Sequence, residues 1–145
     1  YVLNGKYHVE IFVFVSEQWL LITLLAALIG VFVLTEQRKS GKTLTTSELV
    51  RLMNDDEAVV VDVRSAAEFE SGHIHGALSI PHLKLASRIA ELEKYREKII
   101  VVADKIGQHS GAAGKKLSAA EFNVRRLGGG ISEWQGSSLP LVKGK

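Results

Sequence analysis

A run of residues without a single charged side chain most constrains what this chain can fold into. The run extends from Trp19 to Leu34, and Thr23 carries its only polar side chain. A core helix in a small domain keeps polar residues on its outer face, so a helix that is apolar all round indicates a membrane. The sequence "TEQRKSGK" that follows lacks the small-residue cleavage site of a signal peptide. We therefore expect an uncleaved anchor in the lipid bilayer.

The apolar run by itself is short for a membrane span. Its helix would measure about 24 Å, against the roughly 30 Å of the hydrocarbon core. Extension upstream predicts a transmembrane helix over residues 14–35, with Trp19 near one interface, where aromatic belts lie. Residues 1–13 then form an N-terminal segment, and residues 36–44 form a basic juxtamembrane linker.

Lys and Arg residues predict the orientation of this single-pass span. Arg38, Lys39 and Lys42 follow the span, whereas only Lys6 precedes it. Cytoplasmic flanks carry the excess of basic residues. We therefore expect the N-terminus outside, as an extracytoplasmic segment, and the C-terminal domain in the cytoplasm.

Apolar runs and helical patterns alternate through residues 45–145. The predicted strands are "AVVVDV", "GALSIP", "KIIVVA" and "NVRRL", and the predicted helices are "TTSELVRLMN", "SAAEFESG", "LASRIAELEKY" and "SGAAGKKLSAAEF", the last with Ser110 as N-cap. Thr45 with Glu48, and Ser65 with Glu68, have the spacing of capping boxes. This alternation predicts an open α/β domain with a parallel sheet, in which ligands bind beyond the carboxyl ends of the strands.

Composition excludes several classes of function. Lys and Arg number 18 and Asp and Glu 16, so the net charge is +2. Nucleic-acid binding needs a concentrated basic face, and the signs here are interspersed, so no nucleic-acid partner is expected. The chain contains no cysteine. That absence excludes disulfides, thiolate nucleophiles and Cys-ligated metals.

The segment "VDVRSAAEFESGHIHGALSIP", residues 61–81, follows a predicted buried strand. Asp62 and Arg64 can pair there, Glu68 can cap a short helix and Gly72 permits a turn. The segment resembles the rhodanese family, which carries D-x-R, then E-[FY], then G-H-I-x-G-A and a Pro. The matching residues are Asp62, Arg64, Glu68, Phe69, Gly72, His73, Ile74, Gly76, Ala77 and Pro81.

A second signature of that family, L-x-G-G-x-x-x-W, is similar to "RRLGGGISEW". Leu127, Gly128, Gly129 and Trp134 are taken as its matching residues. The resemblance covers about Thr43 to Trp134. The ending "SSLPLVKGK" and the single anchor resemble a narrower group of bacterial inner-membrane members, which implies an inner-membrane location.

The resemblance implies a sulfurtransferase loop that reads C-R-x-G-x-R-S in active members. Its Cys thiolate accepts sulfur as a persulfide, and loop amides and arginines stabilise the anion. The corresponding loop here is Asp104, Lys105, Ile106, Gly107, Gln108, His109 and Ser110. The loop keeps the family's length, whereas the phosphatase relatives use one residue more. The nucleophile position holds a carboxylate, which cannot carry a persulfide.

Three interpretations of this loop remain open. The first is a catalytically inactive module, in which Asp104 supplies its own charge to the loop amides and the domain recruits a membrane or membrane-associated protein. The second is an altered enzyme with Asp104 as nucleophile, or Asp104 and His109 as an acid–base pair. The third is a sensor of small anions that uses Lys105, His109 and Ser110.

No cofactor and no metal are expected from the sequence. His73 and His75 are two residues apart at a predicted turn, and His82 stands alone. A metal site needs three or four convergent donors.

Overall fold

The computed structural model describes residues 2–144 as two compact units, one ending at Glu36 and the other beginning at Gln37. The first unit contains helix α1 (Val2–Glu17) and most of helix α2 (Trp19–Lys39). The second unit contains all the strands and the remaining helices of the described chain.

A bend at Gln18 divides the segment that was predicted as one helix over residues 14–35. The hydroxyl of Ser16 donates a hydrogen bond to the carbonyl of Val13, a contact that often bends helices because it competes for the helical acceptor. By length and composition α2 is a candidate membrane span, with a mean hydropathy of 2.2. Its 21 residues measure about 31 Å, which matches a bilayer core.

The second unit is built on a parallel sheet of five described strands in the order β1-β5-β4-β2-β3. The strands are β1 (Lys42–Leu44), β2 (Ala58–Asp62), β3 (Leu78–Ser79), β4 (Ile99–Ala103) and β5 (Val124–Leu127). The runs "AVVVD" and "IIVVA" lie at the centre of the sheet, where both faces are covered. The predicted α/β class, with a parallel sheet and a preceding apolar helix, is confirmed.

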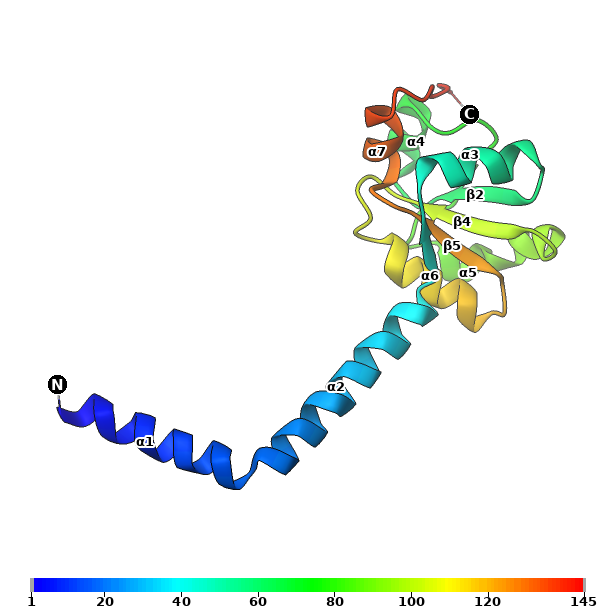
Figure 1. The fold of residues 1–145 in the computed structure, drawn as a ribbon. Coiled ribbons are helices and arrows are strands. Elements are labelled where there is room, and N and C mark those ends of the chain that lie inside the picture. The colour runs from blue at the N-terminus through cyan, green and yellow to red at the C-terminus, as the bar shows by residue number, and fades with distance from the viewer. Residues whose placement is uncertain (1, 145) are drawn as a thin grey trace. The chain divides into compact units, whose positions relative to one another are not determined.

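Helices cover both faces of this sheet (Figure 1). On one face α3 (Thr46–Asn54) and α7 (Gly130–Gly136) pack over a core that includes Leu49, Val101 and Trp134. On the other face α5 (Leu85–Arg88), the 3₁₀ helix η1 (Ile89–Tyr95) and α6 (Ser110–Ala119) pack over a core that includes Val102. The short helix α4 (Ala66–Ser71) follows β2.

The structure differs from the predicted linker over residues 36–44. Helix α2 continues to Lys39, and Lys42–Leu44 form edge strand β1, which pairs with β5. Only Leu44 of this strand is buried, so the strand has no apolar run by which the sequence would predict it. Gly41 makes the turn between helix and strand at a φ of +87°, a conformation that favours glycine.

Two further elements differ from the sequence-based prediction. The segment "LASRIAELEKY" was predicted as one helix, but it forms α5 and then tightens into the 3₁₀ helix η1. Helix α7 was not predicted, and it begins at Gly130, which has a φ of +62°. Glycine has a low helix propensity, so a helix that starts in a glycine run gives no signal in the sequence.

Candidate functional site

The loop between β4 and α6 lies at the carboxyl end of a central strand and closes around the side chain of Asp104. The carboxylate accepts hydrogen bonds from the backbone N–H groups of Gly107, His109 (2.6 Å) and Ser110 (3.3 Å). Only 2% of Asp104 is exposed. Three amides that could hold an external anion are therefore already bonded to a carboxylate of the chain itself.

Gly107 and Ser110 keep this loop in shape. Gly107 has a φ of +103°, which disfavours residues with a side chain. The Ser110 hydroxyl donates to the carbonyl of Gly107 at 3.1 Å. Ser110 is the first residue of α6, and His109 occupies the N-cap position, which corrects the predicted N-cap by one residue. The Asp104 carboxylate, and not a side chain at the N-cap, accepts the backbone N–H groups of His109 and Ser110 at the start of α6.

The turn before α7 supports the loop from behind. The N–H groups of Ile131 and Ser132 donate to the carbonyls of Asp104 (2.8 Å) and Lys105 (3.0 Å). Gly130 lies closest to those carbonyls. Counted from Leu127, the signature L-x-G-G requires its glycines at positions 129 and 130, so the assignment to Gly128 and Gly129 was wrong by one residue. Both Gly129 and Gly130 have a positive φ.

An open pocket of about 210 Å³ adjoins the loop. Its lining residues are Arg64, Ser65, Glu68, His82, Asp104, Lys105, Ile106, Gln108 and His109. The imidazole rings of His82 and His109 stack with centroids 4.1 Å apart and an angle of 13° between the planes. His82, which stood alone in the sequence, is therefore part of the site. No spacing rule would have found it, because the two histidines are far apart in the chain.

The side chains of Asp104 and His109 do not form the acid–base pair that the altered-enzyme interpretation considered. Asp104 contacts His109 through the backbone N–H, and the imidazole stacks on His82. The Lys105 side chain is exposed and forms no ion pair within residues 2–144. The pKa of Glu68 is lowered by hydrogen bonds from the Ser65 hydroxyl and backbone, with smaller contributions from the charges of Arg64 and Lys105.

Asp62 and Arg64 form a buried ion pair that supports the loop after β2. The Arg64 guanidinium donates to Asp62 through Nε (2.9 Å) and Nη2 (2.6 Å), and Nη2 also donates to the carbonyl of Gly72 (2.8 Å). Glu68 closes the capping box with Ser65, as predicted. These residues therefore hold the backbone of the segment together.

The remaining residues of the two signatures also have structural contacts. His73 Nδ1 lies 2.8 Å from the carbonyl oxygen of Phe69, and the two rings stack at 3.7 Å. Gly76 turns the chain toward β3 at a φ of +76°. The Trp134 indole donates to the carbonyl of Pro140 at 3.0 Å. Among the described residues, no three His, Asp or Glu side chains gather as a metal site requires.

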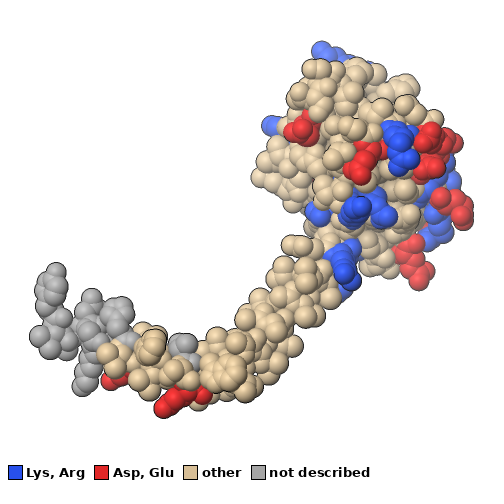
Figure 2. Space-filling view, in the orientation of Figure 1, with Lys and Arg blue, Asp and Glu red and all other residues tan. Residues whose placement is uncertain are grey.

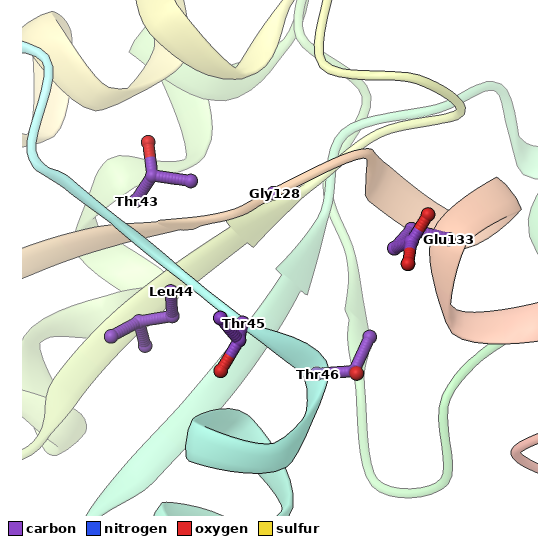
Figure 3. A pocket seen from close by; sticks show the side chains of 6 residues that line it. All are labelled: Thr43, Leu44, Thr45, Thr46, Gly128 and Glu133. Carbon is purple, nitrogen blue, oxygen red and sulfur yellow. The ribbon is translucent and has the colours of Figure 1, made fainter. Parts of the chain in front are cut away.

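Two other pockets lie away from the loop. One of about 270 Å³ lies where β1 and the start of α3 face α7; Figure 3 shows its lining residues Thr43, Leu44, Thr45, Thr46, Gly128 and Glu133. The other, of about 360 Å³, is lined by residues of α4 and of the β3 region. Both pockets are lined mainly by apolar surface, and neither lining identifies a ligand.

Comparison with known proteins supports the resemblance in the sequence. The family model described as "Rhodanese-like domain" matches residues 45–137. The chain is 37% identical over 141 residues to YibN of Escherichia coli K12, an uncharacterised protein, covering 94% of this chain and 99% of the relative. It is 30% identical over 96 residues to the thiosulfate sulfurtransferase GlpE of Shewanella oneidensis, covering 66% and 93%.

Solved structures are similar as well. The crystal structure of a rhodanese-related protein from Thermoplasma volcanium superposes with a TM-score of 0.64 at 29% sequence identity. The match covers 70% of this chain and 97% of that one. The predicted narrower group is supported too, because the match to YibN covers 94% of this chain, well beyond the residues that the family model matches.

Proposed function

This chain belongs to the rhodanese-like domain family, and we propose that it is a membrane-anchored member without sulfurtransferase activity that recruits a partner protein at the cytoplasmic face of a bacterial inner membrane. The single observation that carries the proposal is the position of the Asp104 carboxylate. This carboxylate accepts hydrogen bonds from the backbone N–H groups of Gly107, His109 and Ser110, which point into the loop.

Sulfur transfer by this family requires a thiolate to hold the persulfide, and the chain has no cysteine. A carboxylate at the same position forms no stable bond to a sulfane sulfur. Its charge also opposes the approach of anions such as thiosulfate to amides that are already bonded. The altered-enzyme and anion-sensor alternatives are disfavoured for the same reason.

An assay of sulfur transfer from thiosulfate to cyanide tests the loss of activity. The full chain, purified in detergent, is expected to produce no thiocyanate above the rate without enzyme. GlpE of Shewanella oneidensis, assayed in the same detergent, is the positive control. Turnover by the full chain that survives repurification would overturn the proposal.

The membrane location rests on α2 and its basic flank. Arg38 and Lys39 lie in the last turn of the helix, and the positive-inside rule then puts the domain in the cytoplasm. Protease added to spheroplasts is expected to leave the domain intact until the membrane is lysed. Cleavage of the domain in intact spheroplasts would reverse the proposed orientation.

The rim of the site supports recruitment of a protein. In the described residues of the domain, the exposed large apolar side chains are Leu83 (84%), Ile106 (53%) and Val142 (37%). Ile106 lines the site pocket, and Leu83 follows His82, which lines it as well. Val142 lies away from this pocket, beside His73, so the support rests on Ile106 and Leu83, because exposed apolar side chains next to a pocket are typical of protein interaction sites.

Site-specific photo-crosslinking in intact membranes tests recruitment. A photoreactive residue at position 106 is expected to capture the same neighbour repeatedly, whereas one at exposed Ala90 in η1 should not. Substitution of Leu83 by Asp should weaken the crosslink from position 106. A pattern of neighbours that is the same at both positions would remove support for a recruiting surface.

A further inference from the structure

Positive charge is segregated onto three neighbouring elements of the domain. Strands β1 and β5 and helix α6 carry five Lys and Arg residues and no Asp or Glu: Lys42, Lys115, Lys116, Arg125 and Arg126. The whole chain has 18 basic and 16 acidic residues, so the remainder is net acidic. In Figure 2, Lys and Arg atoms are visible on this face of the domain, with Asp and Glu atoms beside some of them. We call these five residues the basic edge, because β1 is the edge strand.

Strand pairing brings two of these cations together. Lys42 on β1 and Arg125 on β5 are register partners, so their side chains leave the same face of the sheet at neighbouring positions. Like charges at paired positions repel each other. The Arg125 guanidinium donates only to nearby oxygens of Asn123 and Val124, and no carboxylate contacts it in the described chain. An anion placed between the two cations would relieve the repulsion.

Helix α6 is held against the same edge. Arg126 donates from Nε to the carbonyl of Gly41 at 3.1 Å, and its Nη1 lies 3.7 Å from the β-carbon position of Gly111. Gly114 packs directly on the backbone of Ser40, because a β-carbon there would lie 2.1 Å from the Ser40 carbonyl oxygen. Lys115 and Lys116, which follow Gly114 on α6, are exposed residues of a helix that packs on the strand carrying Arg125 and Arg126.

We propose that the basic edge binds the anionic phospholipid headgroups of the bilayer that holds the anchor. This inference rests on the membrane anchoring proposed above and goes beyond it, because it assigns a lipid-binding surface to the domain itself. The short stretch of chain between the anchor helix and Lys42 favours a lipid headgroup as the anion. Lys42 is the third residue after the end of α2 at Lys39, so it lies at most about 11 Å from the helix end along the backbone. That is close to the Debye length of about 8–10 Å at physiological salt.

The expected size of the effect follows from the electrostatics of anionic membranes. Each Lys or Arg near such a surface favours the bound state by roughly fivefold. Two cations removed together should therefore lower the ratio of docked to undocked domain by roughly 25-fold.

Energy transfer in nanodiscs tests the proposal with the full chain. Because the chain contains no cysteine, Ala119→Cys on α6 gives a single site for a donor dye. The acceptor is a dye on lipid headgroups, in discs of phosphatidylcholine alone or mixed with phosphatidylglycerol. Transfer is expected to be higher in the anionic discs and to fall with added NaCl. Lys42→Gln with Arg125→Gln should abolish most of this difference.

A matched pair of substitutions serves as the control. Lys84→Gln with Lys143→Gln removes the same charge at exposed positions outside the basic edge and should leave the transfer in anionic discs unchanged. Loss of transfer in both pairs would mean that net charge, and not this edge, attracts the domain, which overturns the proposal. If the Lys42 and Arg125 variant unfolds, the salt dependence of the unsubstituted chain decides, because equal transfer in both disc types also overturns it.

Two further measurements distinguish failure of the membrane anchor from failure of lipid binding by the basic edge. Co-elution of the chain with discs of phosphatidylcholine alone reports anchoring without the basic edge, so a chain that elutes free contradicts the anchor itself. Inorganic phosphate, added at an ionic strength matched with NaCl, should reduce transfer no more than NaCl does. A phosphate-specific loss would identify a site for free phosphate and overturn the assignment to lipid.

Discussion

Gly130 lies directly against the backbone of Asp104: a β-carbon at Gly130 would stand 2.3 Å from the Asp104 carbonyl oxygen and 2.7 Å from that of Lys105. The N–H of the next residue, Ile131, donates to the same Asp104 oxygen. The start of α7 thus fixes the back of the site loop, while the amides at its front bind the Asp104 side chain.

Substitution of Gly130 by Ala should lower the free energy of unfolding by about 2 kcal/mol or more, because it adds a clash to a left-handed conformation. Gly136→Ala in the same helix is the control. It has no atom within 4 Å of the β-carbon position, so its stability should stay the same or rise by up to about 1 kcal/mol. Urea denaturation measures both, and equal losses would contradict the contact with Asp104.

Restoring the missing thiol should not by itself restore sulfur transfer. Asp104→Cys is expected to give little thiocyanate, since Lys105 and His109 do not reproduce the two-pronged contacts of arginine. Asp104→Cys combined with Lys105→Arg and His109→Arg should be at least tenfold faster than the single variant. Comparable rates for the two variants, in the thiosulfate–cyanide assay, would show that the arginine positions do not limit this loop.

Arg64→Lys should destabilise the domain by about 2 kcal/mol or more. A lysine cannot reach Asp62 and the Gly72 carbonyl together, and the Asp62 side chain is fully buried, so an imperfectly paired charge would remain inside. Arg88→Lys, in the exposed ion pair with Glu91, should cost less than about 1 kcal/mol. Thermal or urea unfolding of the two variants compares a buried pair with a surface pair.

The capping boxes predict a fall in stability in acid. The pKa of Glu68 is lowered by its hydrogen bonds with Ser65, and the pKa of Glu48 by its hydrogen bonds with Thr45, both from an ordinary value of 4.5. Each carboxyl group thus has a lower pKa in the folded chain than in the unfolded chain. Its contribution to stability is therefore complete at a pH above the unfolded-state pKa. The contribution is lost as the pH falls through the folded-state pKa.

Ser65→Ala tests this pH dependence. It should lower the free energy of unfolding by about 1 kcal/mol at pH 7 and make the decline below pH 4.5 shallower than in the unsubstituted chain. Ser71→Ala in the same helix removes a hydroxyl that donates only to a backbone carbonyl, so it should leave the slope unchanged. Unfolding titrations between pH 3 and pH 7 measure the slopes, and parallel curves for Ser65→Ala and the unsubstituted chain would contradict the role of Glu68.

The central strands and the capped helices could be predicted because their signals are local. A buried run such as "IIVVA" and a Thr or Ser three residues before a Glu report their structures directly. Strand β1 could not be predicted in the same way, because two of its three side chains face solvent and its pairing partner, β5, lies far along the chain.

The site was predictable in outline but not in its contacts. The loop from Asp104 to Ser110 could be located because the resemblance extends on both sides of it, from about Thr43 to Trp134. The stacking of His82 on His109 and the fit of Gly130 behind the loop depend on tertiary packing, which one sequence does not encode as a spacing. The bend at Gln18 was missed because a helix interrupted at one residue keeps its apolar composition on both sides.

Any free anion that binds the loop amides must compete with the Asp104 carboxylate. Asp104 is part of the same chain as the three amides that it contacts, so its local concentration there does not fall when the protein is diluted. A free anion must displace this tethered group, and its own concentration in a cell is far lower. An external anion would therefore have to be at a high concentration to replace Asp104 on these amides.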